Sequence, residues 1–143
     1  MPAYDPNNIF AKILRGEVPC YKIYEDDHTF SFLDIMPRCT GHTLVIPKAP
    51  ARNLLDITVE DYLHVGRTVH KVARAAHRAF NADGLTIQQF NEHAGGQMVF
   101  HLHVHVMPRM SGVALLPPMS NKETPEVLEQ HAARIVAALE AAA

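Results

Sequence analysis

Three histidines alternate with apolar residues in the stretch His101–Met107, which reads HLHVHVM. A period of two is typical of a β-strand, on which side chains two residues apart point to the same face at a spacing of roughly 6.6 Å. The pattern therefore predicts one face of imidazoles and an opposite apolar face that packs against a core. The three imidazoles belong to His101, His103 and His105.

Such a row of imidazoles allows three interpretations. It can be a solvated strand surface, although histidine is an uncommon choice for one. It can supply nitrogen ligands to a metal such as zinc. It can also carry phosphoryl or nucleotidyl transfer, with one histidine as the nucleophile and a neighbour as the proton donor.

A glycine-containing loop, residues 91–100, precedes the histidines and favours the third interpretation. Gly95 and Gly96 let the backbone approach a ligand and turn its N–H groups toward it. Gln97 adds a side chain with both a donor and an acceptor. No second group of carboxylates or thiolates stands nearby in the sequence to complete a metal shell. The loop therefore suits an oxyanion such as phosphate better than a cation.

The sequence Gly-Gly-Gln at residues 95–97, followed by the alternating histidines, resembles the histidine-triad (HIT) superfamily, whose motif is His-φ-His-φ-His-φ-φ with φ apolar. The similarity spans roughly residues 8–110 and is greatest to the Hint-like bacterial members. Four further blocks resemble the opening segments of those members: residues 8–19, 24–27, 32–35 and 41–48.

The resemblance implies an α+β fold, a five-stranded antiparallel sheet with one long central helix and a C-terminal helix. It also implies a homodimer that extends the sheet across two chains. The middle histidine, His103, is expected to attack the α-phosphorus of a purine nucleotide and form a nucleotidyl-histidine. His101 and His105 are expected to supply positive charge or hydrogen bonds to the phosphoryl oxygens.

The resemblance further assigns the nucleotide contacts. Asp34 matches the carboxylate that binds the ribose hydroxyls, although from the residues alone it would equally cap its own backbone. The phosphate positions are Asn91, Gln97 and the backbone at Met98 and Val99. The base pocket comprises Ile9, Phe10, Phe32, Ile35 and Leu44, each of which would otherwise be assigned to the core.

Two departures from the family pattern matter. Relatives often carry serine or threonine where Met98 stands, and a thioether cannot donate a hydrogen bond to a leaving group. Many bacterial members also hold a structural zinc, and three of its four ligand positions are here Asn8, Ala11 and Pro50. Only His101 matches, and one imidazole cannot hold a structural zinc. We therefore expect no metal and no other cofactor.

Three functions fit these residues. Hint-like members hydrolyse nucleoside phosphoramidates, and the N-terminal blocks favour this function. Fhit-like members cleave dinucleoside polyphosphates, with the same triad. A slow nucleotide-binding sensor or interaction protein is the third; the intact triad argues against it, whereas Met98 is compatible with it. The sequence leaves the physiological substrate open.

Two further histidines lie close to the motif residues. His42 precedes an apolar run at residues 43–46, and we expect it to have a structural role through a hydrogen bond to a backbone group. His93 lies in the glycine loop, where the sequence allows contact either with substrate or with water.

Composition predicts one cytoplasmic domain of 143 residues, with a core at about 8–110 and a C-terminal extension at about 111–143. A net charge of −2 argues against a protein that coats nucleic acid. The two cysteines, Cys20 and Cys39, form no paired motif, as is typical of a reduced compartment. No signal peptide and no apolar stretch of about 20 residues is evident, so we expect no membrane contact.

Capping residues and the lengths of the connections predict where the helices and strands lie. Thr58 is expected to cap a long helix that ends near residues 81–84, and Thr124 with Pro125 to begin a last helix. Short connections between strands predict antiparallel neighbours. A short helix is expected at residues 9–14, and strands at 21–25, 29–33, 43–46, 85–90 and 101–107.

Overall fold

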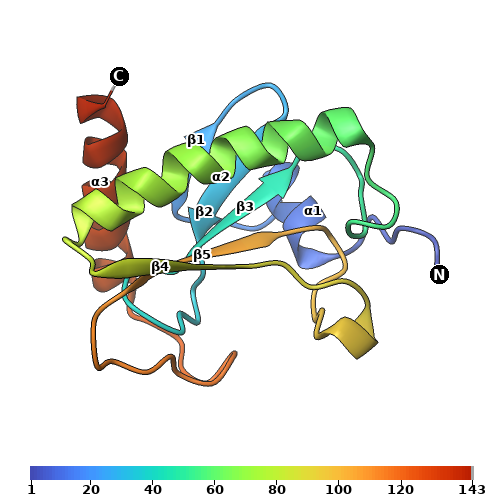
Figure 1. Ribbon diagram of the computed structural model, residues 1–143. Coiled ribbons are helices and arrows are strands. Elements are labelled where there is room, and N and C mark those ends of the chain that lie inside the picture. Colours follow the sequence, from blue (N-terminus) through green and yellow to red (C-terminus); the bar gives the residue numbers. More distant parts are fainter. Residues whose placement is uncertain (143) are drawn as a thin grey trace.

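The structure, a computed structural model, describes residues 1–142 and has one five-stranded antiparallel sheet in the order β1-β2-β3-β5-β4 (Figure 1). This arrangement confirms the predicted α+β class. The elements are α1 (Ile9–Leu14), β1 (Lys22–Glu25), β2 (Thr29–Leu33), β3 (Thr43–Pro47), α2 (Val59–Ala79), β4 (Gly84–Gln88), a 3₁₀ turn at His93–Gly95, β5 (Val104–Arg109) and α3 (Pro125–Ala141).

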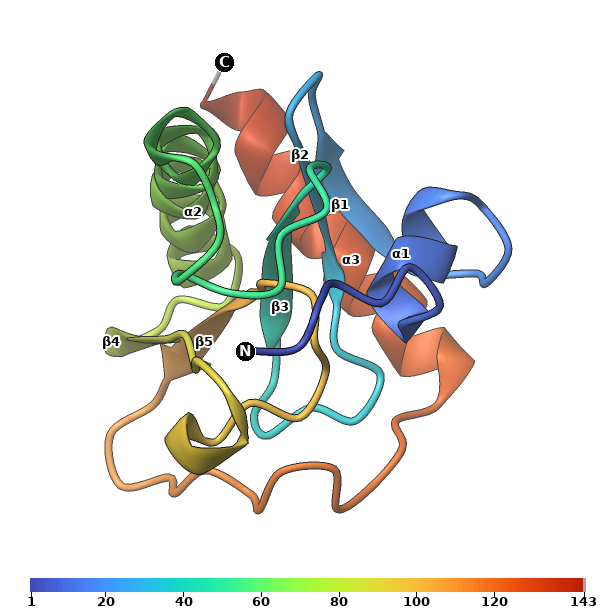
Figure 2. The same ribbon diagram turned by 90° about the vertical axis from the view of Figure 1, so that its right-hand side faces the viewer.

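The helices cover the two faces of the sheet unequally. The long α2 lies on one face, where α3 packs against it, and the short α1 lies on the other face (Figure 2). The larger core, beneath α2 and α3, takes in Leu102, Val104 and Val106, as the alternating pattern predicted. The histidines therefore face the α1 side, where a smaller cluster of Phe and Ile residues forms the second core.

Side-chain caps begin two of the helices. Thr58 Oγ1 accepts a hydrogen bond from the backbone N–H of Asp61, which confirms the predicted start of α2. Asn8 caps α1 in the same way, with its Oδ1 accepting from Ala11 N at 2.9 Å. Pro125 is the first residue of α3, as predicted.

Two predicted strand bounds are wrong. The strand expected from His101 begins at Val104, because the backbone N–H of Leu102 donates to Ala51 O instead of to a strand neighbour. His101 and His103 therefore precede the strand, and only His105 lies within it. The strand expected to reach residue 90 ends at Gln88, where the chain turns into the glycine loop.

Two further observations concern the chain as a whole. Cys20 and Cys39 are both free thiols. None of the helices within residues 1–142 is both long and apolar enough to cross a membrane.

Candidate active site

His103 is held by one ring nitrogen, and the other ring nitrogen keeps its lone pair. Its Nδ1 lies 2.7 Å from the carbonyl oxygen of His101, and a carbonyl can only accept. The proton is therefore on Nδ1, which leaves Nε2 unprotonated. Burial lowers the pKa of His103, so the ring is neutral near pH 7. The edge of Phe10 packs against it with ring centroids 4.9 Å apart.

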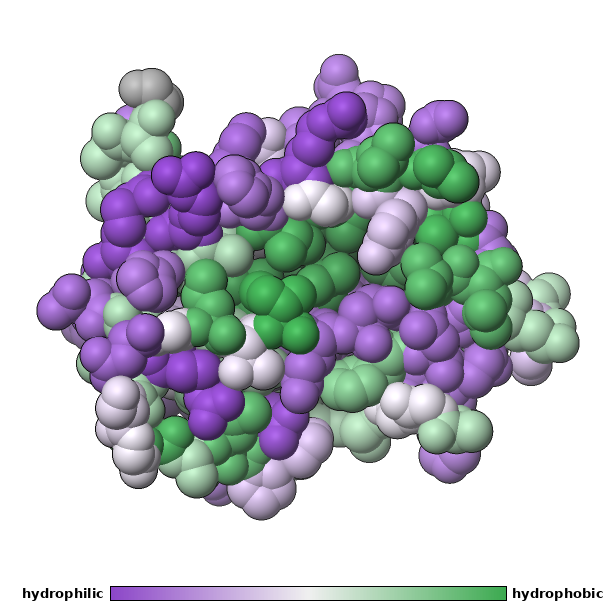
Figure 3. Space-filling view, viewed as in Figure 1, coloured by the Kyte–Doolittle hydropathy of each residue, from purple (hydrophilic) through white to green (hydrophobic). Residues whose placement is uncertain are grey.

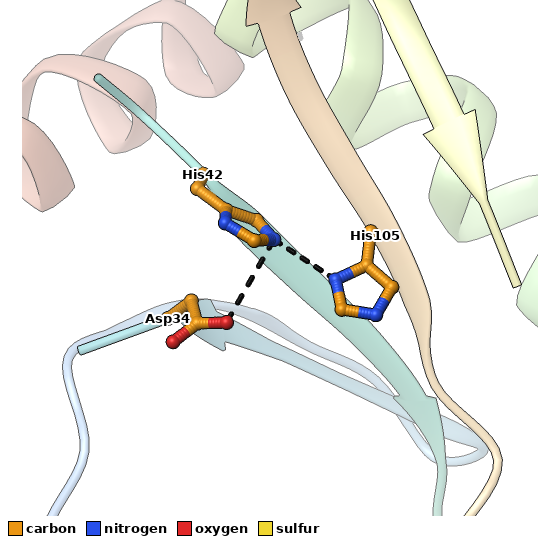
Figure 4. A group of neighbouring side chains, drawn as sticks. All are labelled: Asp34, His42 and His105. Carbon is orange, nitrogen blue, oxygen red and sulfur yellow. Dashed lines mark hydrogen bonds and ion pairs between the residues drawn. The ribbon is translucent and has the colours of Figure 1, made fainter. Parts of the chain in front are cut away.

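His42 and His105 form a directed hydrogen-bond chain (Figure 4). The His105 ring lies 5.0 Å from the His103 ring between centroids. The backbone N–H of Arg38 donates to His42 Nδ1 at 3.0 Å, so neutral His42 carries its proton on Nε2. That Nε2–H donates to His105 Nδ1 at 2.9 Å, which in turn places the proton of His105 on Nε2. Burial lowers the pKa of His42 to about 4 and that of His105 to about 3. The chain therefore ends in a neutral imidazole whose Nε2–H is available to a ligand.

Asp34 completes a group of three with His42 and His105, whose potential ligand atoms lie within 4.8 Å of one another. Asp34 Oδ2 is 3.7 Å from His42 Nε2, and burial raises the pKa of its carboxyl. Coordination of a metal through Nε2 of neutral His42 would move the proton to Nδ1, where it would oppose the N–H of Arg38. The geometry thus favours proton positioning over metal binding.

The C-terminal extension reaches this chain of histidines through Arg38. The backbone N–H of Leu116 donates to Arg38 O, and Arg38 Nε donates to Leu116 O, both at 2.8 Å. The N–H of Glu123 donates to Ile35 O at 2.9 Å. The segment between β5 and α3 therefore holds the loop that follows Asp34.

His101 has no nitrogen left for a phosphate. The residue is 0% exposed; its Nε2 lies 2.8 Å from Pro47 O, and its Nδ1 lies 2.6 Å from the hydroxyl of Tyr4. Burial lowers its pKa to about 4, so the ring is neutral. His101 was expected to supply positive charge or a hydrogen bond to the phosphoryl oxygens, and its hydrogen bonds in this structure do not support that role. Its backbone carbonyl instead accepts a hydrogen bond from His103 Nδ1.

Gln97 is also fully engaged within the protein. Its Oε1 accepts from the N–H of Glu92 at 2.8 Å and from Asn53 Nδ2 at 3.0 Å. Its Nε2 donates to Arg52 O at 2.7 Å and to Val99 O at 3.0 Å. The side chain is 1% exposed. In this structure the Gln97 side chain supports the loop, and its expected place among the phosphate-binding residues stays a prediction.

The backbone of the glycine loop is better placed to bind an anion. Gly96 has φ +96°, a conformation that favours glycine, and it ends the 3₁₀ turn. Within residues 1–142, the N–H groups of Met98 and Val99 have no acceptor, as the expected phosphate contacts require. The Met98 side chain is 61% exposed, and His93 is exposed at the start of the 3₁₀ turn. Asn91 Oδ1 accepts from Leu54 N and so joins the loop to a neighbouring segment.

An ion pair that the sequence did not reveal stabilises the same loop. Glu92 has φ 64° and ψ 166°, a conformation rare for residues with a side chain and costly to hold. Arg52 donates to its carboxylate through Nε at 2.6 Å and Nη2 at 3.0 Å, and Asn53 Nδ2 donates at 2.5 Å. The Arg52 hydrogen bond keeps the pKa of Glu92 below its ordinary value. The guanidinium also lies over the Phe100 ring, 4.1 Å from its centroid.

The residues expected to bind the base fall into two groups. Phe10, Phe32 and Leu44 pack together in the smaller core, with the Phe10 and Phe32 rings 5.4 Å apart. Ile9 and Ile35 are 42% and 38% exposed. Phe10 thus joins the apolar cluster to His103, and Ile35 is an exposed apolar neighbour of Asp34.

The residues at the structural zinc positions of bacterial relatives do not fit that metal. Asn8 caps α1, Ala11 is buried and has no ligand atom, and Pro50 is exposed and has none either. Both nitrogens of His101 are engaged.

Comparison with known proteins adds an independent view. The HIT domain pattern matches residues 15–112. A crystal structure of a Hit-like protein from Bartonella henselae is 51% identical, with a TM-score of 0.92, and the match covers 96% of this chain and 99% of that one. A histidine triad nucleotide-binding protein from Sulfolobus tokodaii is 30% identical, with a TM-score of 0.84 and coverage of 92% and 91%. Adenylylsulfatase HINT3 of Arabidopsis thaliana is 33% identical over 90% of this chain and 65% of its own length.

Proposed function

Because the chain belongs to the HIT domain family, we propose that it is a nucleotide-binding hydrolase acting at the α-phosphate of purine nucleoside phosphoramidates or related nucleotide conjugates. One observation carries this proposal. The hydrogen bond from His103 Nδ1 to the carbonyl of His101 leaves Nε2 as a buried, neutral nucleophile. The neighbouring N–H groups of Met98 and Val99 suit a phosphoryl oxygen, which supports the same chemistry.

The reaction proceeds in two displacements. His103 Nε2 attacks the α-phosphorus, the bond from phosphorus to the amine nitrogen breaks, and the amine leaves after taking up one proton. Water then attacks the phosphorus of the nucleotidyl-histidine, the bond to Nε2 breaks, and one proton is released. The Nε2–H of His105 donates a hydrogen bond to the reacting groups, because His42 occupies its Nδ1. The ring is neutral and keeps this proton, so the proton taken up by the amine comes from solvent.

A second candidate substrate is adenylyl sulfate, and Met98 favours it. A thioether donates no proton, and the histidines beside His103 are neutral, so a leaving group that needs no proton departs more readily than an amine. Sulfate leaves as a stable anion. The similarity to a protein named adenylylsulfatase supports testing this substrate beside a phosphoramidate.

The test is hydrolysis of an AMP phosphoramidate, adenylyl sulfate and a diadenosine polyphosphate by wild type, His103→Ala and the surface control His28→Gln. We expect release of AMP from at least one of the first two substrates and a loss of at least about 10⁴-fold in His103→Ala. Wild type quenched in alkali, in which the bond from phosphorus to histidine nitrogen is stable, should contain AMP bonded to His103. Preference for the polyphosphate would overturn the substrate class, and binding of AMP without hydrolysis of any substrate would identify a nucleotide sensor.

We also propose that two copies associate through β4, which is an edge strand of the sheet. Leu85 and Ile87 on β4 are 38% and 46% exposed, and a groove between α2 and β4 is lined by Tyr62, Leu63 and Ile87. Figure 3 shows apolar side chains gathered on this face. A second copy would cover this surface and extend the sheet.

Light scattering on the purified protein tests the association. Wild type should have twice the chain mass, and Ile87→Glu should have the mass of one chain. Leu54→Glu is the control, an exposed apolar residue outside the groove. A single-chain mass for wild type would contradict the proposal. A cytoplasmic location and the absence of nucleic-acid partners stay predictions.

A further inference from the structure

Tyr4 lies in the N-terminal segment before α1, yet its hydroxyl reaches the histidine motif 97 residues away. The oxygen is 2.6 Å from His101 Nδ1, and Asn8 Nδ2 donates to the same oxygen at 3.0 Å. The two rings meet edge to face with centroids 5.6 Å apart. A residue of the N-terminal segment is thus in direct contact with a fully buried histidine of the motif.

The direction of each hydrogen bond follows from the cap of α1. Asn8 Oδ1 accepts from the N–H of Ala11, so the other end of the amide must be the NH₂ group. That group donates to Asp5 O and to the Tyr4 oxygen. The Pro47 carbonyl can only accept, so the proton of the neutral His101 ring is on Nε2 and Nδ1 is unprotonated. The phenol proton of Tyr4 is therefore directed at His101 Nδ1.

The consequence reaches the nucleophile. Tyr4 and Pro47 act on the His101 ring from opposite sides: the Tyr4 hydroxyl donates to Nδ1, and Nε2–H donates to Pro47 O at 2.8 Å. The ring is fixed between two partners, and the carbonyl of the same residue accepts from His103 Nδ1. We propose that Tyr4, oriented by the helix-capping Asn8, is a positioning residue that holds His101 in the Nε2–H tautomer and thereby holds the carbonyl that orients His103.

This arrangement also accounts for the poor fit to a structural zinc. The phenol occupies the nitrogen of His101 that is not bonded to Pro47. Asn8, which stands at a zinc-ligand position of bacterial relatives, instead orients that phenol. A hydrogen-bonded chain thus joins the N-terminal segment to the motif where those relatives use a metal.

The direct test is the tautomer of His101, read from long-range ¹H–¹⁵N spectra of the imidazoles in the full-length protein. Wild type should show Nδ1 unprotonated and Nε2 protonated. Tyr4→Phe removes the donor and should give mixed tautomers or a protonated ring. Asn8→Asp keeps an oxygen for the Ala11 N–H but replaces the amide donor by an acceptor, which should turn the phenol proton away from His101. Tyr24→Phe, which removes a phenol that contacts Asp26 and Lys71, should leave the His101 signals unchanged.

The expected effect of these substitutions on turnover rests on the proposed function. Tyr4→Phe and Asn8→Asp should each lower kcat roughly tenfold, with KM changed less than kcat, as for other partners that orient a functional histidine. An unchanged His101 tautomer in both variants would overturn the proposal, as would unchanged kcat. If Tyr4→Phe does not fold, Asn8→Asp decides alone. If wild type hydrolyses none of the nucleotide conjugates, the proposed function fails, while the spectra still decide whether Tyr4 sets the tautomer.

Discussion

The two histidines that flank His103 in the motif are the same residue type at the same spacing, yet they are held in opposite ways. Both nitrogens of His101 are hydrogen-bonded, Nδ1 to the hydroxyl of Tyr4 and Nε2 to the carbonyl of Pro47. His105 has only one nitrogen engaged: His42 donates to its Nδ1, and its Nε2–H is available to a ligand. Burial keeps both rings neutral. The role of each is therefore set by the partner of its second nitrogen.

The largest expected effect separates these two histidines. His105→Ala should lower kcat by about 10²- to 10³-fold, because it removes the donor that faces the reacting groups. His101→Ala should lower kcat less but should destabilise the fold by more than about 2 kcal/mol, because it leaves Tyr4 and the Pro47 carbonyl without their buried partner. Steady-state kinetics and urea unfolding measure both. If His105→Ala and His101→Ala changed kcat equally and the free energy of unfolding equally, the two histidines would not have different roles.

His42→Leu should have a smaller effect on turnover. The substitution removes the donor to His105 Nδ1, so the His105 proton is shared between its two nitrogens and the Nε2–H is present for only part of the time. We expect a fall in kcat of about tenfold or more, with His103 still able to form the covalent intermediate. Rapid-quench kinetics and the imidazole spectra check this. A His105 that keeps a single Nε2–H tautomer without His42 would contradict it.

Acid should destabilise the protein through the same buried rings. The folded pKa values of His42 and His101 are about 4, below the unfolded value of about 6.5, so the unfolded chain binds more protons in this window. The free energy of unfolding should therefore fall as the pH falls from about 6.5 to about 4, by at most about 3 kcal/mol for each such histidine. Urea titrations across this range measure the slope. His42→Leu should reduce the slope.

The smallest expected effect concerns metal. Because Asn8, Ala11 and Pro50 offer no set of zinc ligands and His101 is fully hydrogen-bonded, a chelator should change neither Tm nor turnover. Thermal unfolding and AMP release with and without EDTA provide the measurement. A fall in Tm of several degrees on chelation, restored by zinc, would reveal a metal site elsewhere.

Much of the fold follows from local patterns. Alternation around residues 101–107 placed Leu102, Val104 and Val106 in the larger core because side chains on an extended chain change face at every residue. Thr58 and Pro125 marked helix starts because a cap depends on residues within one turn. The family resemblance likewise pointed to His103 as the nucleophile; the structure adds that its Nδ1 is bonded to the carbonyl of His101, and the catalytic role itself stays a prediction.

The sequence by itself therefore determined the elements, the faces of the sheet and the residue types available for chemistry. Only the tertiary structure decided where β5 begins, that Gln97 and the Arg52–Glu92 pair support the loop, and that His42 and Tyr4 act on the motif from distant segments. The reason is physical. The state of an imidazole depends on which donor or acceptor lies about 3 Å from each nitrogen, and here those partners come from residues 4, 38, 42 and 47, which no local pattern connects to residues 101–105.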